Sequence, residues 1–351
     1  MANADKTRDR IEKLRQMLAG LTSLLIVMQD NPDPDSIAAA VALRKLANTL
    51  TQTACTITCG GTVGRGENRA LVRYLGLEMR APGEIQFDRY PVIALVDTQP
   101  GTGNNSLPAG RIPEIVIDHH PIKPLTRSAK LVDIRTRYGA TATILFEYLV
   151  AAGIAPDVPL ATALIFAIRS DTQDLGREAT SADIKAISQL FPIANKRMLS
   201  EIQRGSVPRE YFRMLSEALT NTKTYDDLAV TDLQEVDNPD MIGEVADLLL
   251  REENTHWTLC SGLYDNRLLL SLRTDQPSNR ADHVMKRLVS RKGSGGGHLS
   301  YAGGQISIDG RTRAQIAHLR EAVLKRLLKC LGKEPTGQDL VRPRDVSPLS
   351  I

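Results

Sequence analysis

The sequence of 351 residues has almost no excess of charge of either sign, few aromatic residues and no long apolar run. Its 44 Lys and Arg residues nearly balance its 41 Asp and Glu residues, which leaves a net charge of +3. This balance excludes a polybasic protein that coats duplex nucleic acid, and it excludes an acidic disordered chain. The longest nearly apolar stretch, residues 160–168, is far shorter than the ~18–20 residues of a membrane span.

Signals for secretion and for disulfides are also missing. The first ten residues carry charges of both signs, and no apolar core of a signal peptide follows them. The four cysteines include no CxxC pair, and Cys55 and Cys59 lie on one face of an alternating, strand-like run. With 42% hydrophobic and 24% charged residues, the composition is typical of a globular protein. We therefore expect a soluble, cytoplasmic protein without disulfides, and its length predicts two domains.

The first two thirds of the chain alternate short apolar runs with helical stretches. The runs predict strands at residues 24–28, 54–59, 92–96 and 115–117. The intervening patterns predict helices at residues 36–50, 68–75, 141–152 and 160–168. Apolar strands that alternate with helices are typical of a parallel α/β sheet covered on both faces.

After about Ser206 the pattern changes to that of a smaller α+β unit. It predicts helices at 208–222, 281–290 and 312–331, and a hairpin of residues 258–264 and 267–272 around Asp265-Asn266. We therefore expect a catalytic, metal-binding domain at 1–205 and a linker at 206–224. A substrate-binding domain at 225–335 and a mobile tail at 336–351 would follow.

Side chains that could bind metal follow the predicted strands, at the point where each strand ends. The set comprises Gln29, Asp33, Asp35, Asp97, Asp118, His119 and His120, and Asp171 joins it after an apolar helix. In an open parallel sheet, ligands bind at the carboxyl edge of the strands. Carboxylates gathered there would repel one another unless cations neutralised them.

Each of these residues alone also has an ordinary structural explanation. Asp33 and Asp35 around Pro34 could form a turn and a helix cap, Asp97 could cap a turn, and Asp-His-His could be a surface loop. Their joint occurrence at one sheet edge favours a metal site. Imidazole mixed with carboxylates suits a hard divalent ion such as Mn²⁺, and two ions ~3.5–4 Å apart suit in-line attack on phosphorus. The residues therefore predict metal-dependent phosphoester hydrolysis.

A glycine run in the second domain is a candidate site for a nucleotide. Residues 293–297 read GSGGG, His298 follows, and a second glycine pair stands at 303–304. Exposed backbone N–H groups and His298 could donate to a phosphate, and Arg273 at a strand end could hold an anion. The alternative is a flexible linker.

These motifs together resemble a known family. NPDPDS at 31–36, Asp97 after a strand, DHH at 118–120, SDT at 170–172 and GGGH at 295–298 occur in this order. The chain resembles, from about residue 15 to 331, the DHH phosphoesterases that carry a DHH-associated C-terminal domain. It looks most like the compact bacterial branch of oligoribonuclease/pAp phosphatases and cyclic-dinucleotide phosphodiesterases. The resemblance implies a parallel-sheet α/β N-terminal domain and a smaller α+β C-terminal domain, with the active site in the cleft between them.

The resemblance also implies roles for individual residues. Asp33 would bind the first metal, Asp35, His119 and Asp171 the second, and Asp97 would bridge both. Asp118 would support this shell from behind, and His120 would face the substrate phosphate and protonate the leaving oxygen. The nucleotide would be held by Arg273, Gly296, Gly297 and His298.

One position departs from the family pattern. The family usually has a histidine four residues before the first Asp of the PDxD run, and this chain has Gln29. A Gln amide oxygen is a neutral ligand and weaker than imidazole for Mn²⁺, and the neighbouring Asp30 could partly substitute. We therefore expect a weakened first metal site.

The expected activity is that of a Mn-dependent phosphodiesterase. It would hydrolyse short oligonucleotides or dinucleotides to nucleoside monophosphates by two-metal hydroxide attack. One Trp, five Phe and a nearly balanced charge favour a small nucleotide ligand over a long duplex or a membrane. The alternatives are a cyclic-dinucleotide phosphodiesterase, a pAp phosphatase, and a non-catalytic nucleotide sensor marked by Gln29. The resemblance is also compatible with a homodimer.

Overall fold

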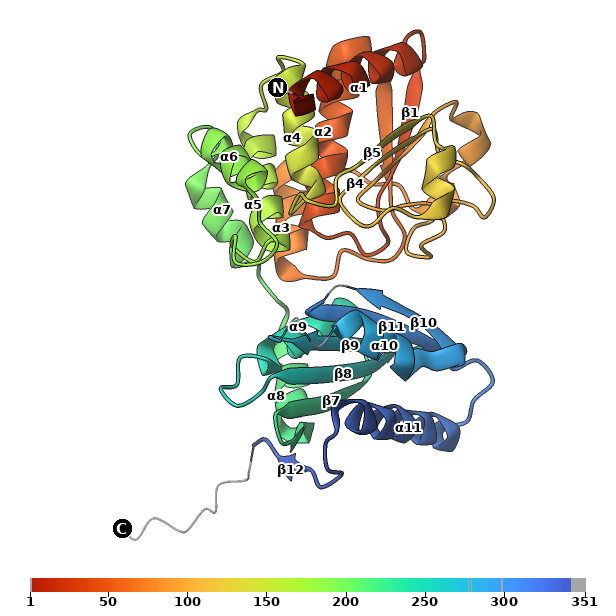
Figure 1. The fold of residues 1–351 in the computed structure, drawn as a ribbon, viewed down its shortest axis with the longest axis vertical. Coiled ribbons are helices and arrows are strands. Elements are labelled where there is room, and N and C mark those ends of the chain that lie inside the picture. Colours follow the sequence, from red (N-terminus) through yellow and green to blue (C-terminus); the bar gives the residue numbers. More distant parts are fainter. Residues whose placement is uncertain (1, 277, 279, 298, 342–351) are drawn as a thin grey trace. The chain divides into compact units, whose positions relative to one another are not determined.

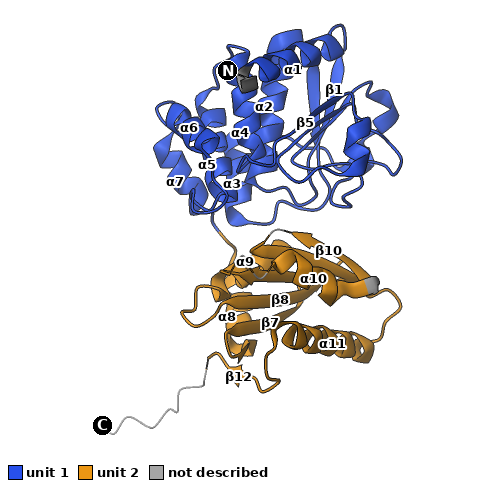
Figure 2. Ribbon diagram, viewed as in Figure 1, with its two compact units in different colours: residues 1–206 blue, residues 207–351 orange. Residues whose placement is uncertain are grey.

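The computed structural model of the chain describes residues 2–276, 278, 280–297 and 299–341 (Figure 1). The chain divides into two compact units, residues 1–206 and 207–351 (Figure 2). Each unit has hydrophobic clusters of its own. No described helix combines the length and the apolarity that crossing a bilayer requires.

The first unit is built on a parallel five-stranded sheet with the strand order β2-β1-β3-β4-β5. The strands are β1 (Ser23–Val27), β2 (Ala54–Thr58), β3 (Ile93–Val96), β4 (Ile115–Asp118) and β5 (Leu131–Ile134). All residues of β3 and β4 are buried, as expected for central strands covered on both faces. The predicted α/β fold class is therefore confirmed. β5 is not among the predicted strands, because its buried Asp133 interrupts the apolar pattern.

Seven helices of the first unit are described. They are α1 (Ala2–Leu18), α2 (Pro34–Thr51), α3 (Gly66–Leu75), α4 (Thr141–Ala151), α5 (Val158–Asp171), α6 (Ser181–Leu190) and α7 (Lys196–Gln203). Apolar residues of α1, α2 and α4 pack in one cluster with one face of the sheet. The opposite face packs against Ile85 and Phe87, from the segment with the short 3₁₀ helices Pro82–Glu84 and Phe87–Arg89, and against Leu107, between β3 and β4. Both faces are thus covered, the second by irregular chain.

The second unit contains a mixed seven-stranded sheet with the order β10-β11-β9-β8-β7-β6-β12. Its strands are β6 (Lys223–Tyr225), β7 (Leu228–Glu235), β8 (Trp257–Tyr264), β9 (Arg267–Thr274), β10 (Gly293–Gly297), β11 (Tyr301–Ser307) and β12 (Gln338–Asp339). Its helices are α8 (Arg209–Asn221), α9 (Asp240–Leu249), α10 (Ala281–Val289) and α11 (Arg313–Leu331). The predicted hairpin is confirmed: β8 and β9 pair antiparallel, and Asp265 and Asn266 both have positive φ, as a type I′ turn requires.

The segments predicted as linker and tail contain regular structure. Within residues 206–224, α8 packs its apolar side chains, including Ala218, with those of β7 in the second unit. Within residues 336–351, β12 pairs with β6, and residues 342–351 lie outside the described part of the chain.

The glycine run is a strand and not a flexible linker, the alternative that its composition left open. Gly293–Gly297 forms β10 and pairs along its whole length with β11. A Cβ at Gly304 of β11 would lie 2.4 Å from Met285 Sδ, and one at Gly295 would lie 3.0 Å from Met285 Cγ. These glycines therefore allow α10 to pack closely on the two strands.

Candidate metal centre

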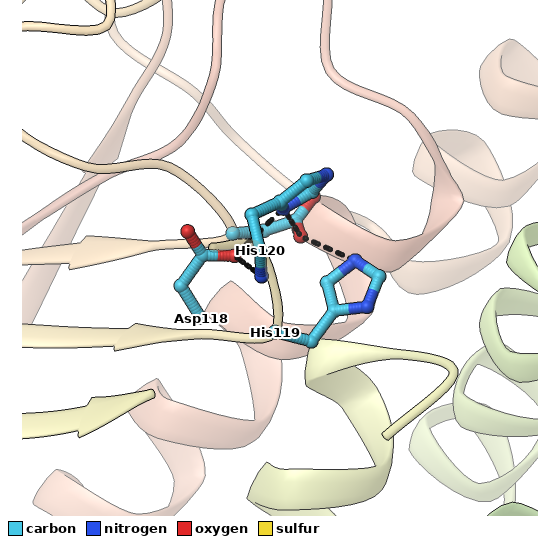
Figure 3. Close-up of side chains that lie close together, drawn as sticks. Asp118, His119 and His120 are labelled. Carbon is cyan, nitrogen blue, oxygen red and sulfur yellow. Dashed lines mark hydrogen bonds and ion pairs between the residues drawn. The ribbon is translucent and has the colours of Figure 1, made fainter. Parts of the chain in front are cut away.

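Charged side chains meet at the carboxyl edge of the first sheet. β3 ends at Val96 and β4 at Asp118, so Asp97 and the Asp118–His120 run reach the same edge. Figure 3 shows Asp118 and the two histidines that follow it at the end of the strand. Asp35, in the first turn of α2, and Asp171, the last residue of α5, approach from the helical side.

Two groups of potential ligand atoms each lie within 4.8 Å of one another. One group is Asp97, Asp118, His119 and His120, and the other is Asp35, His119 and Asp171. His119 belongs to both, since its Nε2 lies 3.3 Å from Asp171 Oδ2 and 3.7 Å from Asp97 Oδ1. Its Nδ1 donates to the carbonyl oxygen of Tyr138 at 3.1 Å, so Nε2 is the nitrogen that faces the carboxylates.

Asp97 occupies an unusual backbone conformation. Its φ is 57°, in the left-handed region that Asp and Asn tolerate better than most residues. The buried carboxylate accepts a hydrogen bond of 3.0 Å from Thr141 Oγ1. The turn at Asp97 therefore directs a charged side chain into the interior at the end of a buried strand.

Asp35 is held by the first residues of α4. Its two carboxylate oxygens accept hydrogen bonds of 2.7 Å from the backbone N–H groups of Thr141 and Ala142. Burial and the nearby Asp33 charge nevertheless raise the pKa of Asp35 to about 6, against the opposing influence of His119 and these amides.

The pKa values of the cluster show which carboxylates have too few hydrogen-bond donors or positive charges around them. Burial, together with repulsion from Asp35 and other carboxylates, raises the pKa of Asp97 well above its usual range. Burial and the same kind of repulsion raise the pKa of Asp171 to about 7, although His119 opposes this. Burial alone would lower the pKa of His119, but Asp171 and Asp35 outweigh it and raise the value. The cluster thus retains protons when no cation is bound.

Asp118 behaves differently because it has close donors. Burial would raise its pKa, but the hydrogen bond from His120 Nδ1 (2.8 Å) and the charges of both imidazoles lower it to about 2. Gln99 Nε2 adds a hydrogen bond of 2.7 Å to the other carboxylate oxygen. Asp118 therefore stays ionised and orients His120.

The donor set fits hard divalent cations. Carboxylate oxygens and one imidazole nitrogen suit Mn²⁺ or Mg²⁺ better than a thiolate-binding ion. The raised pKa values of Asp35, Asp97 and Asp171 show that the site has more buried negative charge than its own donors neutralise. A bound cation would supply the missing positive charge.

Comparison with known proteins identifies the family. Residues 23–168 match the family model described as "DHH family, N-terminal domain". The first unit therefore contains a DHH-family N-terminal domain. The chain is also 33% identical over 288 residues to an uncharacterized protein of Methanocaldococcus jannaschii; the match covers 81% of this chain and 58% of the relative. This chain therefore spans less than two thirds of that relative's length.

Solved structures share the DHH-family fold. An exopolyphosphatase-related protein from Bacteroides fragilis has a TM-score of 0.69 at 16% identity, covering 92% of this chain and 98% of its own. The exonuclease RecJ bound to manganese has a TM-score of 0.50 at 14% identity, covering 92% and 94%. At these identities the likeness shows the fold alone.

Three polar residues that precede the DHH motif have other contacts in the fold. Asp33 caps α2 by accepting a hydrogen bond of 2.9 Å from the Ser36 N–H, and its charge contributes to the raised pKa of Asp35. Gln29 pairs through its backbone with Asn105. Asp30, suggested as a partial substitute for Gln29, instead accepts hydrogen bonds of 2.8 Å from Gly60 N and Ser106 Oγ.

A segment without predicted site residues positions several side chains of the candidate metal centre. Residues 138–142 contribute the Tyr138 carbonyl to His119, the first amides of α4 to Asp35 and the Thr141 hydroxyl to Asp97. Buried Asp183 holds this segment by accepting a hydrogen bond of 3.0 Å from Gly139 N. The start of the predicted helix at residue 141 was an available signal, because helix N-termini bind anions.

The residues predicted to bind nucleotide lie in the second unit. Arg273 Nε donates to Asp247 Oδ1 at 2.5 Å, so its guanidinium already has a carboxylate partner. Gly296 and Gly297 pair with β11, and a Cβ at Gly296 would meet nothing within 4 Å. His298 lies outside the described residues.

Proposed function

We propose that this protein is a Mn²⁺-dependent phosphodiesterase that cleaves short oligonucleotides or dinucleotides to nucleoside monophosphates. The observation that carries the proposal is the convergence of buried Asp35, buried Asp97 and half-buried Asp171 on His119, with raised carboxyl pKa values that a bound cation would lower. RecJ, an exonuclease whose solved structure contains manganese, supports both the ion and the reaction class.

The metal ligands would come from residues of the first unit. His119, Asp35 and Asp171 would hold one ion, Asp33 and Gln29 would hold the other, and Asp97 would be a ligand of both. When bound, the two ions would activate water and neutralise charge on the phosphate oxygens. Thr141 and Ala142 would keep the Asp35 carboxylate in place through their hydrogen bonds.

His120 would act on the leaving group. His120 Nδ1 donates a hydrogen bond to Asp118, so Nε2 is the ring nitrogen left for the substrate. Because the pKa of Asp118 is lowered to about 2, this carboxylate stays charged and keeps accepting this hydrogen bond. We therefore assign His120 as the group that delivers a proton to the leaving oxygen.

The second unit would bind the nucleotide through Arg273, Gly296, Gly297 and His298. An anion bound to Arg273 would share the guanidinium with Asp247. We place the reaction in the cytoplasm, since all four cysteines are free thiols, as a reducing compartment keeps them.

The test is mass-spectrometric product analysis with Mn²⁺ and a panel of substrates. The panel contains linear RNA dinucleotides, an RNA hexamer, pAp, a cyclic di-purine nucleotide and a 24-mer RNA. Mononucleotides released from dimers and hexamer, with little from the 24-mer, are expected. Preferential turnover of the cyclic dinucleotide or of pAp would select one of the rival activities. Binding without turnover of any substrate would select the sensor, for which Gln29 is the motivating residue.

A further inference from the structure

We propose that a basic groove between α3 and α7 binds the phosphate backbone of a single-stranded oligonucleotide, beyond the bond that is cleaved. This inference rests on the proposed function and selects short oligonucleotides, rather than pAp or a cyclic dinucleotide, as the substrate. The groove belongs entirely to the first unit, where α3 and α7 pack together.

The groove is a hollow of about 600 Å³ with three arginines in its wall. Arg69 and Arg73 come from α3, and Arg204 follows the last residue of α7. Arg73 and Arg204 are exposed, and Arg69 is half-buried. Tyr74 and Met198 provide apolar surface in the same wall. A cationic track next to an aromatic ring is typical of sites for single-stranded nucleic acid.

The positive charge of the groove is not neutralised by acidic neighbours. Among the described residues, Arg69, Arg73 and Arg204 have no carboxylate partner. Arg69 donates instead to the carbonyl oxygens of Gly64 and Ser206, which leaves its charge in place. Glu201 is the acidic residue in the wall, and Arg197 already pairs with it at 2.9 Å. The groove therefore attracts an anion.

A chain of contacts connects the groove with the metal centre. Asn68 of α3 donates to the Pro32 carbonyl oxygen at 3.2 Å, and Pro32 precedes Asp33. A second hollow of about 260 Å³ is lined by Ser170, next to Asp171, and by Gln203, next to Arg204. Neighbouring residues thus line both hollows. In the proposed complex, the further phosphates of an oligonucleotide held at the metal centre would pass this second hollow, where Arg169 pairs with Asp174, before they reach the arginines.

Binding of a fluorescein-labelled RNA hexamer tests the groove without requiring hydrolysis. Anisotropy is measured for the full chain in EDTA over a series of KCl concentrations. We expect R73A/R204A to weaken binding about tenfold at low salt and to reduce the slope of log K against log salt by ~0.7 per lost phosphate contact. The control K13A/R89A removes two exposed cations, one on α1 and one ahead of β3, and should bind as the wild type does.

The outcomes separate this inference from the proposed function. If R73A/R204A and the wild type bind the hexamer with equal affinity, the groove does not bind RNA, whether or not Mn²⁺-dependent hydrolysis is found. If R73A/R204A loses binding and the wild type shows no hydrolysis, the groove binds RNA but the proposed phosphodiesterase activity is wrong. A polyglutamate peptide that displaces the hexamer at equal charge concentration would indicate an acidic protein partner and contradict the assignment.

Discussion

Asp97 combines two unfavourable features that a purely structural residue would avoid. Its backbone has a positive φ, and its carboxylate is buried next to other carboxylates, which raises its pKa well above the usual range. Strain of this kind persists where the surrounding structure enforces it, and it concentrates at functional sites. Thr141 Oγ1 stabilises one oxygen of Asp97, which leaves its remaining charge for a cation.

The substitution Asp97→Asn tests the role of this charge with little change in shape. Asn tolerates positive φ and can still accept the Thr141 hydrogen bond, so the fold should be kept. We expect hydrolysis to fall at least about 100-fold because a metal ligand loses its charge. Thermal unfolding in EDTA at pH 8 should show no loss of stability, since a repelled buried charge is removed. Substantial activity of this variant would contradict the proposed metal centre.

Gln29→His tests the weakened first metal site. An imidazole is a stronger ligand for Mn²⁺ than an amide oxygen, so calorimetric titration should show tighter binding of one ion. The control Gln16→His places the same side chain on α1, where Gln16 contacts Glu12. If Gln29→His changes neither Mn²⁺ affinity nor turnover, Gln29 does not act as a ligand.

At the scale of elements, the sequence predicts those strands that are marked by a short local run of apolar residues. The strands that precede Asp97 and Asp118 are short and wholly apolar before those residues, so the strands could be predicted, and with them the gathering of acidic and histidine side chains at their ends. The hydrogen bond between His119 and Tyr138 could not be predicted, because it uses the backbone carbonyl of Tyr138, which only the tertiary fold brings to His119. β10 escaped prediction because its composition, GSGGG, is unfavourable for a strand and is explained by the packing of Met285.

Two alanine substitutions within β10 test this explanation. A Cβ at Gly293 would lie 2.0 Å from the backbone oxygen of Gln305, whereas one at Gly296 would meet nothing within 4 Å. We expect Gly293→Ala to destabilise the second unit by about 1–3 kcal/mol, as overpacking does. Gly296→Ala should stay within about 0.5 kcal/mol of wild type. Urea unfolding and hydrogen exchange of β10 and β11 measure both, and equal effects would refute a close approach of the strands at Gly293.

At the scale of the whole molecule, the buried acids of the first unit make folding depend on pH. The folded pKa values of Asp35 and Asp171, about 6 and about 7, exceed the ordinary value of 3.8. Between pH 4 and 7 the folded chain therefore binds more protons than the unfolded chain, and its free energy of unfolding falls as pH rises. His119, whose pKa is also raised, acts in the same direction above pH 6.5. Asp118, with a pKa of about 2, stabilises the folded chain at neutral pH, and this contribution is lost only as the pH falls from about 4 to about 2.

Urea unfolding at pH 5.5, 6.5 and 7.5, in EDTA and in Mn²⁺, measures this dependence. In EDTA we expect stability to decrease with pH, by at most ~1.4 kcal/mol per pH unit for each proton by which the two states differ. In Mn²⁺ the decrease should shrink or reverse, since the ion binds the deprotonated ligands of the folded state and is bound more tightly as pH rises. Asp97→Asn should flatten the profile in EDTA, because it removes one of the repelling carboxylates. Stability in EDTA that is constant or increases from pH 5.5 to 7.5 would show that these acids are compensated without a metal, and the two-ion centre would lose its electrostatic basis.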